Sequence, residues 1–171
     1  KKWAGPDRLV WNCIEAKLAD HDMRVTPAQL RAEVWMSLIH GSRGIIYFVH
    51  QFKPVFREAS LFEDAELVKA VTEVNREIKE YAPLLNGPSL DKLTVTGPIA
   101  AMAKRRGDEI FLFAVGMSDQ KSSATIRLNE LKGPHTIEVL GENRSANFTG
   151  EYTGDFNGYE VPIFRIRANA R

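Results

Sequence analysis

The hydrophobic pattern of the chain changes near residue 90. Before this point, short continuous apolar runs alternate with longer segments in which apolar residues recur every three or four positions. After it, only short strand-like runs follow. The first pattern is typical of α/β structure and the second of an all-β domain. We therefore expect an α/β part over residues 1–88 and a small antiparallel β-sandwich over residues 89–171.

Two apolar runs in the first part, residues 9–15 and 44–49, are too short for core helices and rich in strand-forming residues. We expect both to be buried strands, joined by a helix into a parallel sheet with a right-handed crossover. Two strands alone leave the edges of such a sheet unprotected. The pattern therefore favours a chain that continues N-terminally into a larger α/β sheet or barrel.

Each strand is followed by a helix with recognisable start and stop signals. Both helices are expected to begin at a capping box, in which a hydroxyl residue precedes Gln or Glu by three positions. Gly and Pro residues mark the expected stops, near Ile39 and Tyr81. The residues that carry these signals are Thr26, Pro27, Gln29, Gly41, Ser60, Glu63 and Pro83.

Seven short strands with turn signals between them are expected in the second part. Their regular spacing is typical of an antiparallel sandwich or a Greek-key barrel. The expected strands are residues 93–96, 99–105, 109–117, 124–128, 136–140, 145–148 and 159–166. The basic run 104–106 precedes a turn, and we expect it to be solvated.

Composition excludes several kinds of partner and site. The chain has 23 basic and 22 acidic residues, and this balance gives no electrostatic reason to expect nucleic acid or an anionic membrane as partner. No run approaches the roughly 20 apolar residues of a membrane helix. Cys13 is the single cysteine, which excludes an internal disulfide and a cysteine-rich zinc site. Asp20, His21 and Asp22 are metal-binding residue types, but a solvated loop is the favoured interpretation, and no cofactor is expected.

The carboxyl ends of the two strands in the first part are the expected places for chemistry, because βα loops begin there. Glu15 directly follows the apolar run Trp-Asn-Cys-Ile, a rigid and partly desolvated position that suits a nucleophile or an acid/base group. The alternative is a loop residue with a surface salt bridge.

The second strand ends in a run that could contact a sugar. Tyr47, His50 and Gln51 carry hydrogen-bonding groups, and aromatic rings can stack on the apolar face of a pyranose. Trp11, inside the first strand, is a further candidate for substrate binding. The alternative for Tyr47 and Trp11 is packing in the core, and for His50 a surface position.

Three segments together resemble a known family. These are Leu9-Val-Trp-Asn-Cys-Ile-Glu15, the helix that begins at Thr26-Pro27 and ends at His40-Gly41, and Gly44-Ile-Ile-Tyr-Phe48. They resemble the seventh and eighth units of the (β/α)8 barrel of clan A glycoside hydrolases, most closely the β-galactosidase type. The match covers about residues 3–52. It implies that residues 1–88 form the C-terminal portion of a catalytic barrel.

The resemblance implies a retaining hydrolase of β-linked glycosides in which Glu15 is the nucleophile. The acid/base would then lie in a missing N-terminal part of the barrel, since Glu33, Glu58 and Glu63 are poorly placed for it. The chain alone would be inactive. One departure is the plain, charged segment 16–22, where many relatives carry an aromatic or proline-rich run. It leaves open the alternative of a non-catalytic carbohydrate-binding protein built on the same barrel and β-sandwich.

Overall fold

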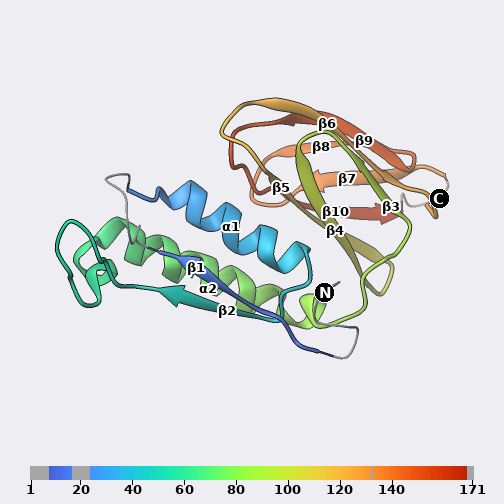
Figure 1. Ribbon diagram of the computed structural model, residues 1–171. Helices are drawn as coiled ribbons and strands as arrows, with labels where there is room; N and C mark the ends of the chain where they lie inside the picture. Colours follow the sequence, from blue (N-terminus) through green and yellow to red (C-terminus); the bar gives the residue numbers. More distant parts are fainter. Residues whose placement is uncertain (1–7, 17–23, 132, 169–171) are drawn as a thin grey trace. The chain divides into compact units, whose positions relative to one another are not determined.

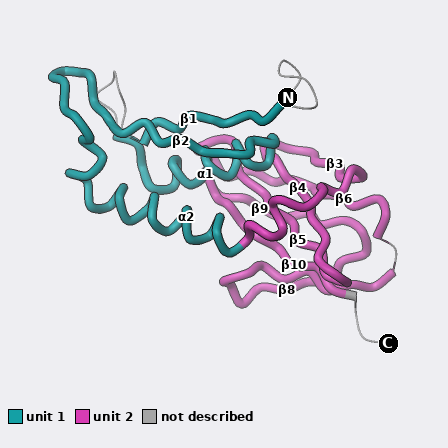
Figure 2. The backbone as a smooth tube through the Cα atoms, turned by 90° about the horizontal axis from the view of Figure 1, so that it is seen from below, with its two compact units in different colours: residues 1–80 teal, residues 81–171 magenta. Residues whose placement is uncertain are grey.

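The computed structural model describes residues 8–16, 24–131 and 133–168 (Figure 1). The chain divides into two compact units, Lys1–Glu80 and Tyr81–Arg171, which Figure 2 colours separately. The first unit contains both α-helices and a parallel strand pair, and the second contains two antiparallel sheets. The expected fold class, two βα units followed by a small β-sandwich, is confirmed.

The first unit follows the expected order of strand, helix, strand and helix. Its elements are β1 (Trp11–Glu15), α1 (Pro27–Ile39), β2 (Gly44–Phe48), the short 3₁₀ helix η1 (Ser60–Glu63) and α2 (Ala65–Leu85), which ends in the second unit. β1 and β2 pair in parallel, in a register that runs from Trp11 opposite Gly44 to Glu15 opposite Phe48. The described residues contain no parallel strands besides these two, so the described part does not close a barrel.

Local signals determine both ends of α1. The backbone N–H of Gln29 donates to the Thr26 hydroxyl over 3.2 Å, and the Gln29 side chain accepts from the Thr26 backbone N–H over 2.9 Å. This is the expected capping box. At the other end, Gly41 has a φ of 94° and donates to the Leu38 carbonyl, while Ser42 donates to the Ser37 carbonyl. These two bonds satisfy carbonyls that the helix leaves open, so Gly41 ends α1 as expected.

The start of α2 differs from the prediction. Ser60 and Glu63 form no capping box; Ser60 is fully buried, and its hydroxyl donates to the Val49 carbonyl over 3.4 Å. Burial after β2 therefore overrides the local signal. Asp64 caps α2 instead, because its carboxylate accepts from the backbone N–H of Leu67 over 3.2 Å.

The end of α2 also lies later than expected. Pro83 is inside the helix, which continues to Leu85. A proline in the last turn removes a single backbone donor, so the helix tolerates it there.

A partly buried contact joins the two helices. The carboxylate of Glu77 in α2 accepts from the Arg31 guanidinium over 3.0 and 3.1 Å and from the Trp35 indole N–H over 3.1 Å. Trp35 is fully buried, so its N–H needs a partner inside the protein. Glu77 meets this need and fixes α1 against α2.

Two antiparallel sheets form the second unit. One has the strand order β4-β5-β10-β7-β8 and the other β3-β6-β9. Apolar side chains from both sheets, among them Leu112, Ile126, Phe148 and Phe164, form one core cluster, which is the arrangement of a β-sandwich. The strands are β3 (Leu93–Thr96), β4 (Ile99–Arg106), β5 (Glu109–Gly116), β6 (Ser122–Leu128), β7 (His135–Val139), β8 (Arg144–Phe148), β9 (Glu151–Phe156) and β10 (Ile163–Ala168).

Two features of the second unit correct the sequence prediction. β9 was not expected, and the last strand begins at Ile163 rather than at residue 159. Lys104 is also not solvated: it is 3% exposed, and its ammonium group donates to the carbonyl oxygens of Leu85 and Gly87 over 3.2 and 2.5 Å. These carbonyls lie in and just after the last turn of α2, where the carbonyl groups have no donor within the helix.

Candidate active site at the carboxyl ends of β1 and β2

The parallel strand pair has one face covered by helices. Asn12 of β1 donates to the Ser37 hydroxyl of α1 over 2.6 Å, and Tyr47 of β2 donates to the side-chain oxygen of Asn75 in α2 over 2.9 Å. Figure 2 shows α1 and α2 on the same side of the strands. Asn12 and Tyr47 therefore face the helices, as does Ile14, the buried register partner of Tyr47.

Glu15 lies on the other face. Side chains alternate along a strand, so Trp11, Cys13 and Glu15 project away from α1 and α2, together with Ile46 and Phe48 of β2. Glu15 is exposed and is the last residue of β1, directly opposite Phe48. Its backbone position continues the sheet, since the N–H of Ala16 donates to the Phe48 carbonyl over 3.1 Å. A rigid strand thus holds the carboxylate at the carboxyl edge of the sheet.

An aromatic cluster extends from this edge into the loop after β2. The ring centroid of Phe48 lies 5.7 Å from that of His50 and 5.8 Å from that of Phe52. Phe56 completes the cluster, 6.1 Å from His50 and 5.6 Å from Phe52. Phe52 and Phe56 are 55% and 57% exposed, which is unusual for large apolar side chains. The cluster thus offers exposed, flat apolar surface next to the end of β1.

The loop that carries the cluster is closed by backbone pairing. Gln51 and Arg57 exchange two backbone hydrogen bonds, of 2.9 and 3.1 Å, which brings Phe52 and Phe56 to the same loop. The sequence did not predict a role for Phe56. Its place in the cluster depends on the backbone pairing of Gln51 with Arg57, and no local sequence pattern indicates that pairing. Two aromatic residues in a short polar loop are the signal that could have found Phe56.

His50 and Gln51 have defined hydrogen-bonding roles. The Nδ1 atom of His50 accepts from the backbone N–H of Ala59 over 3.0 Å, so the neutral ring carries its proton on Nε2. The side-chain amide of Gln51 donates to the Lys53 carbonyl over 2.7 Å, within its own loop. His50 therefore keeps a donor nitrogen for a ligand, whereas the amide nitrogen of Gln51 is already engaged.

The structure separates the other two candidates from Glu15. Tyr47 faces α2, as described above. Trp11 shares the face of Glu15 but lies at the opposite end of β1. Four residues of extended strand separate the two by about 13 Å. Trp11 is 62% exposed, and its ring covers Gly44, where a Cβ atom would lie 2.5 Å from the indole.

A hollow of about 490 Å³ runs along β1, lined by residues from both faces of that strand and by residues of α1. Glu33 of α1 lines it, and burial followed by the charge of Glu15 raises the pKa of Glu33 above its ordinary value. The remaining lining residues are Asn12, Cys13, Ile14, Glu15, Met36, Ser37 and His40. Glu33 is thus electrostatically coupled to Glu15.

The described residues hold no group of three or more His, Cys, Asp or Glu side chains that could bind a metal ion. The Asp20-His21-Asp22 segment lies outside the described residues. Neither helix in the described ranges has the length and apolar character needed to cross a membrane.

No family model and no curated protein matches the sequence. Solved glycoside hydrolase structures share its fold. An Anoxybacillus α-amylase matches with a TM-score of 0.64 and 15% identity over 95% of this chain. The α-amylase of Geobacillus thermoleovorans, solved with acarbose, matches with a TM-score of 0.66 and 11% identity over 95% of the chain. α-Galactosidase I from Mortierella vinacea matches with a TM-score of 0.54 and 12% identity over 89%.

The chain spans about two fifths of these structures, namely 39%, 40% and 38% of their lengths. At such low identity the likeness is one of fold. It agrees with the fold class inferred from the sequence.

Proposed function

We propose that this chain is the C-terminal part of a retaining glycoside hydrolase that cleaves β-linked glycosides, with Glu15 as the nucleophile. The observation that supports this best is the position of Glu15. It ends β1 on the face that α1 and α2 leave uncovered, opposite Phe48 and beside the aromatic cluster. A fold shared with glycoside hydrolases over nearly the whole chain adds to it.

The proposed reaction follows from the carboxylate. An oxygen of Glu15 attacks the anomeric carbon while a second carboxyl group, about 5–5.5 Å away, protonates the leaving oxygen. Water then hydrolyses the covalent intermediate with the second group acting as base. No described carboxylate shares the uncovered face with Glu15, because Glu33 belongs to α1. We therefore place the acid/base in a preceding part of the protein and expect the chain alone to be inactive.

For the substrate, the uncovered rings of Phe52 and Phe56 would stack on the sugar, and Nε2–H of His50 would donate to a hydroxyl. Gln51 and Trp11 stay as weaker candidates for the same role, and Tyr47 would support β2 from the helix side. This chemistry needs no cofactor. The β-sandwich would be an accessory domain.

An α-linked substrate is a second candidate, because the structures that share the fold are named as α-amylases and an α-galactosidase. The deciding experiment is a screen of the complete protein against matched aryl α- and β-glycosides. Turnover of the β-series, with the product first released as the β-anomer in NMR, is expected. Turnover of the α-series alone would transfer the proposal to α-linked substrates.

Glu15→Gln tests the catalytic role in the complete protein. The loss of a nucleophile should lower kcat by more than about 10³-fold. With Glu15→Ala, added azide should restore turnover, because the small anion fits the vacated space and attacks in place of the carboxylate. The matched control is Glu33→Gln, which should keep most activity. Unchanged turnover in Glu15→Gln would remove Glu15 from the mechanism.

The remaining alternative is a carbohydrate-binding protein without catalysis. In that case the unmodified complete protein would bind an oligosaccharide but turn over neither glycoside series. Glu15→Gln would then alter binding only.

A further inference from the structure

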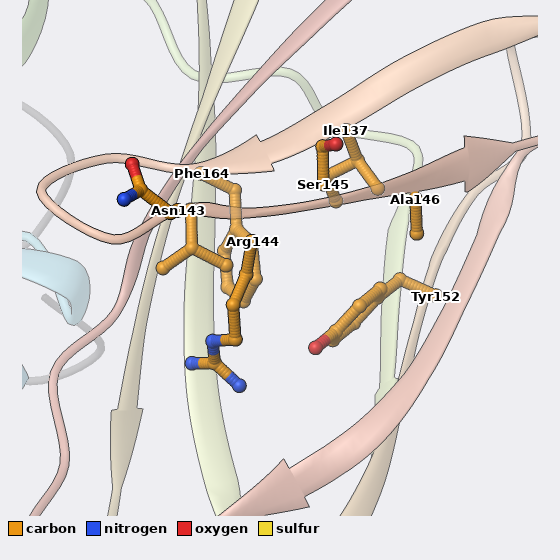
Figure 3. Close-up of a pocket in the computed structure, with 8 residues that line it drawn as sticks. Ile137, Asn143, Arg144, Ser145, Ala146, Tyr152 and Phe164 are labelled. Carbon is orange, nitrogen blue, oxygen red and sulfur yellow. The ribbon is translucent and has the colours of Figure 1, made fainter.

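The β-sandwich contains a hollow of its own. It has a volume of about 450 Å³, within the size range of small-molecule sites. It lies between β8, at the edge of one sheet, and β9, at the edge of the other. Figure 3 shows its lining residues, which are Ile137, Val139, Asn143, Arg144, Ser145, Ala146, Tyr152 and Phe164.

The sequence of β8 explains why the sandwich is open here. Arg144, Ala146 and Phe148 share the face that points toward the core, opposite Val139, Ile137 and His135 of β7. Phe148 is fully buried, but Arg144 and Ala146 are exposed. A methyl group and a guanidinium stand where a sandwich normally places large apolar side chains. The volume left over is the hollow.

β9 contributes an aromatic wall. Tyr152 faces inward opposite Ile126, and its ring packs against Phe164 with a centroid distance of 5.0 Å. Gly154, two residues on, makes room for it, because a Cβ atom there would lie 2.5 Å from the Tyr152 hydroxyl oxygen. The ring is therefore held along the strand, partly buried, with one side toward the hollow.

Arg144, which lines the hollow, is held by two carboxylates next to it. Arg144 Nε donates to a Glu142 carboxylate oxygen over 2.5 Å, and its Nη2 lies 3.6 Å from Glu160. Glu160 is fixed in turn by the Asn157 backbone N–H over 2.6 Å. Figure 3 shows the Arg144 guanidinium and the Tyr152 hydroxyl pointing the same way from opposite sides of the hollow.

The charge balance of this group selects the kind of ligand. One guanidinium faces two carboxylates, so the local charge is negative and an anion is disfavoured. The carboxylates are already paired with Arg144, which leaves little attraction for a cation. Burial raises the pKa of the Tyr152 phenol, so its hydroxyl stays protonated and can donate. An aromatic wall with adjacent donors and acceptors suits a neutral, polyhydroxylated ring.

We propose that this hollow, between Arg144 on β8 and Tyr152 on β9, binds a pyranose unit of a neutral oligosaccharide. The sugar would stack its apolar face on Tyr152 and exchange hydrogen bonds with Arg144, Asn143 and the Tyr152 hydroxyl. This site lies wholly in the second unit and does not depend on Glu15. It would hold a glycan without cleaving it.

NMR titration of the isotope-labelled chain tests the proposal, with maltotriose and cellotriose as neutral probes and trigalacturonate as an anionic one. At least one neutral trisaccharide should shift the amide resonances of Ser145, Ala146 and Tyr152 in a saturable way. The anionic probe should bind more weakly. Shifts confined to residues near Phe52 and Phe56, or no saturable shift with either neutral probe, would overturn the proposal.

Three variants localise the effect. Ala146→Leu adds a side chain inside the hollow without removing any contact, and should weaken binding at least tenfold. Arg144→Met removes donors and should weaken it similarly. The matched control is Arg127→Met, which removes an exposed arginine paired with Glu151 on the neighbouring strand and should leave binding unchanged. Equal binding by Ala146→Leu and the unmodified chain would contradict the assignment even if sugar binds elsewhere.

Discussion

The hydroxyl group of Tyr47 donates a 2.9 Å hydrogen bond to the side-chain oxygen of Asn75. This contact ties β2 to α2 and establishes which face of the strand pair the helices cover. Because side chains alternate, it also places Glu15, on the neighbouring strand, on the opposite face. One contact on the covered face thus defines the orientation of the proposed nucleophile.

Burial against α2 raises the pKa of Tyr47 to about 12, from 10.0. A folded-state pKa above the unfolded value means that the folded chain binds the phenolic proton more tightly, so stability falls as pH rises between these values. Tyr47→Phe should therefore lose less stability than the unmodified chain over this range. Denaturant unfolding at stepped alkaline pH measures this. Asn75→Ala is the control: it removes the acceptor but not the burial, and should keep the pH dependence.

Glu33 provides a second pH test, in the acid range. Burial, and secondly the charge of Glu15, raise its pKa, so the folded chain loses stability as pH rises from about 4.5 upward. Glu33→Gln should be more stable than the unmodified chain at neutral pH, and the difference should vanish below that window. In Glu15→Gln, carbon-detected NMR should show the Glu33 pKa lowered but still above its ordinary value, because burial remains. An unchanged Glu33 titration would show that the two carboxylates are not coupled.

Glu77 joins α1 to α2 through Arg31 and Trp35. Glu77→Ala leaves the buried indole N–H of Trp35 without this acceptor, and we expect a loss of about 2–3 kcal/mol in unfolding free energy. Glu77→Gln keeps an acceptor and should lose less. Glu80→Ala, an exposed change on the same helix, is the control and should stay within about 0.5 kcal/mol. Tryptophan fluorescence during denaturation follows the first unit, whose residues include all three tryptophans. Equal midpoints for the Glu77 and Glu80 variants would contradict the prediction.

Lys104 caps two carbonyls at the end of α2, those of Leu85 and Gly87. In Lys104→Met the carbonyl oxygens of Leu85 and Gly87 lose this charged donor, which should cost about 2 kcal/mol of unfolding free energy. The adjacent Arg105 is exposed and paired with Glu130 at 3.5 Å, so Arg105→Met should change stability by less than about 0.5 kcal/mol. Calorimetry of both variants makes the comparison. A Lys104→Met chain as stable as Arg105→Met would show that the carbonyls find other donors.

Local signals predicted α1 and the strand pair well. The Thr26 box and Gly41 act on neighbouring residues alone, so sequence is sufficient for them. The same signal gave a wrong prediction at Ser60. This side chain is buried after β2 and its hydroxyl donates to the Val49 carbonyl, so Asp64 caps the helix instead. A capping pattern therefore predicts a helix start only where tertiary packing leaves its side chain free.

The misses in the second unit have the same origin. β9 contains Glu151, Gly154 and Asp155, which are poor strand formers, and its pairing with β6 provides the hydrogen bonds that its composition does not suggest. The sequence predicts Lys104 to be exposed, but its side chain is buried and its ammonium group binds carbonyls far away in the sequence. At the candidate site, the end-of-strand position of Glu15 follows from the sequence, whereas the placement of Phe56 depends on a loop pairing that no pattern records.

The face of β1 and β2 that carries Glu15 also presents Trp11 and Ile46 to solvent, at 62% and 49% exposure. In water, neighbouring apolar groups of this size attract similar surfaces on other molecules. Solutions of the chain by itself should scatter more light as they are concentrated, and a mild detergent should reverse this. Replacement of both residues by threonine should have the same effect as the detergent, because threonine favours strand structure and removes the exposed apolar area.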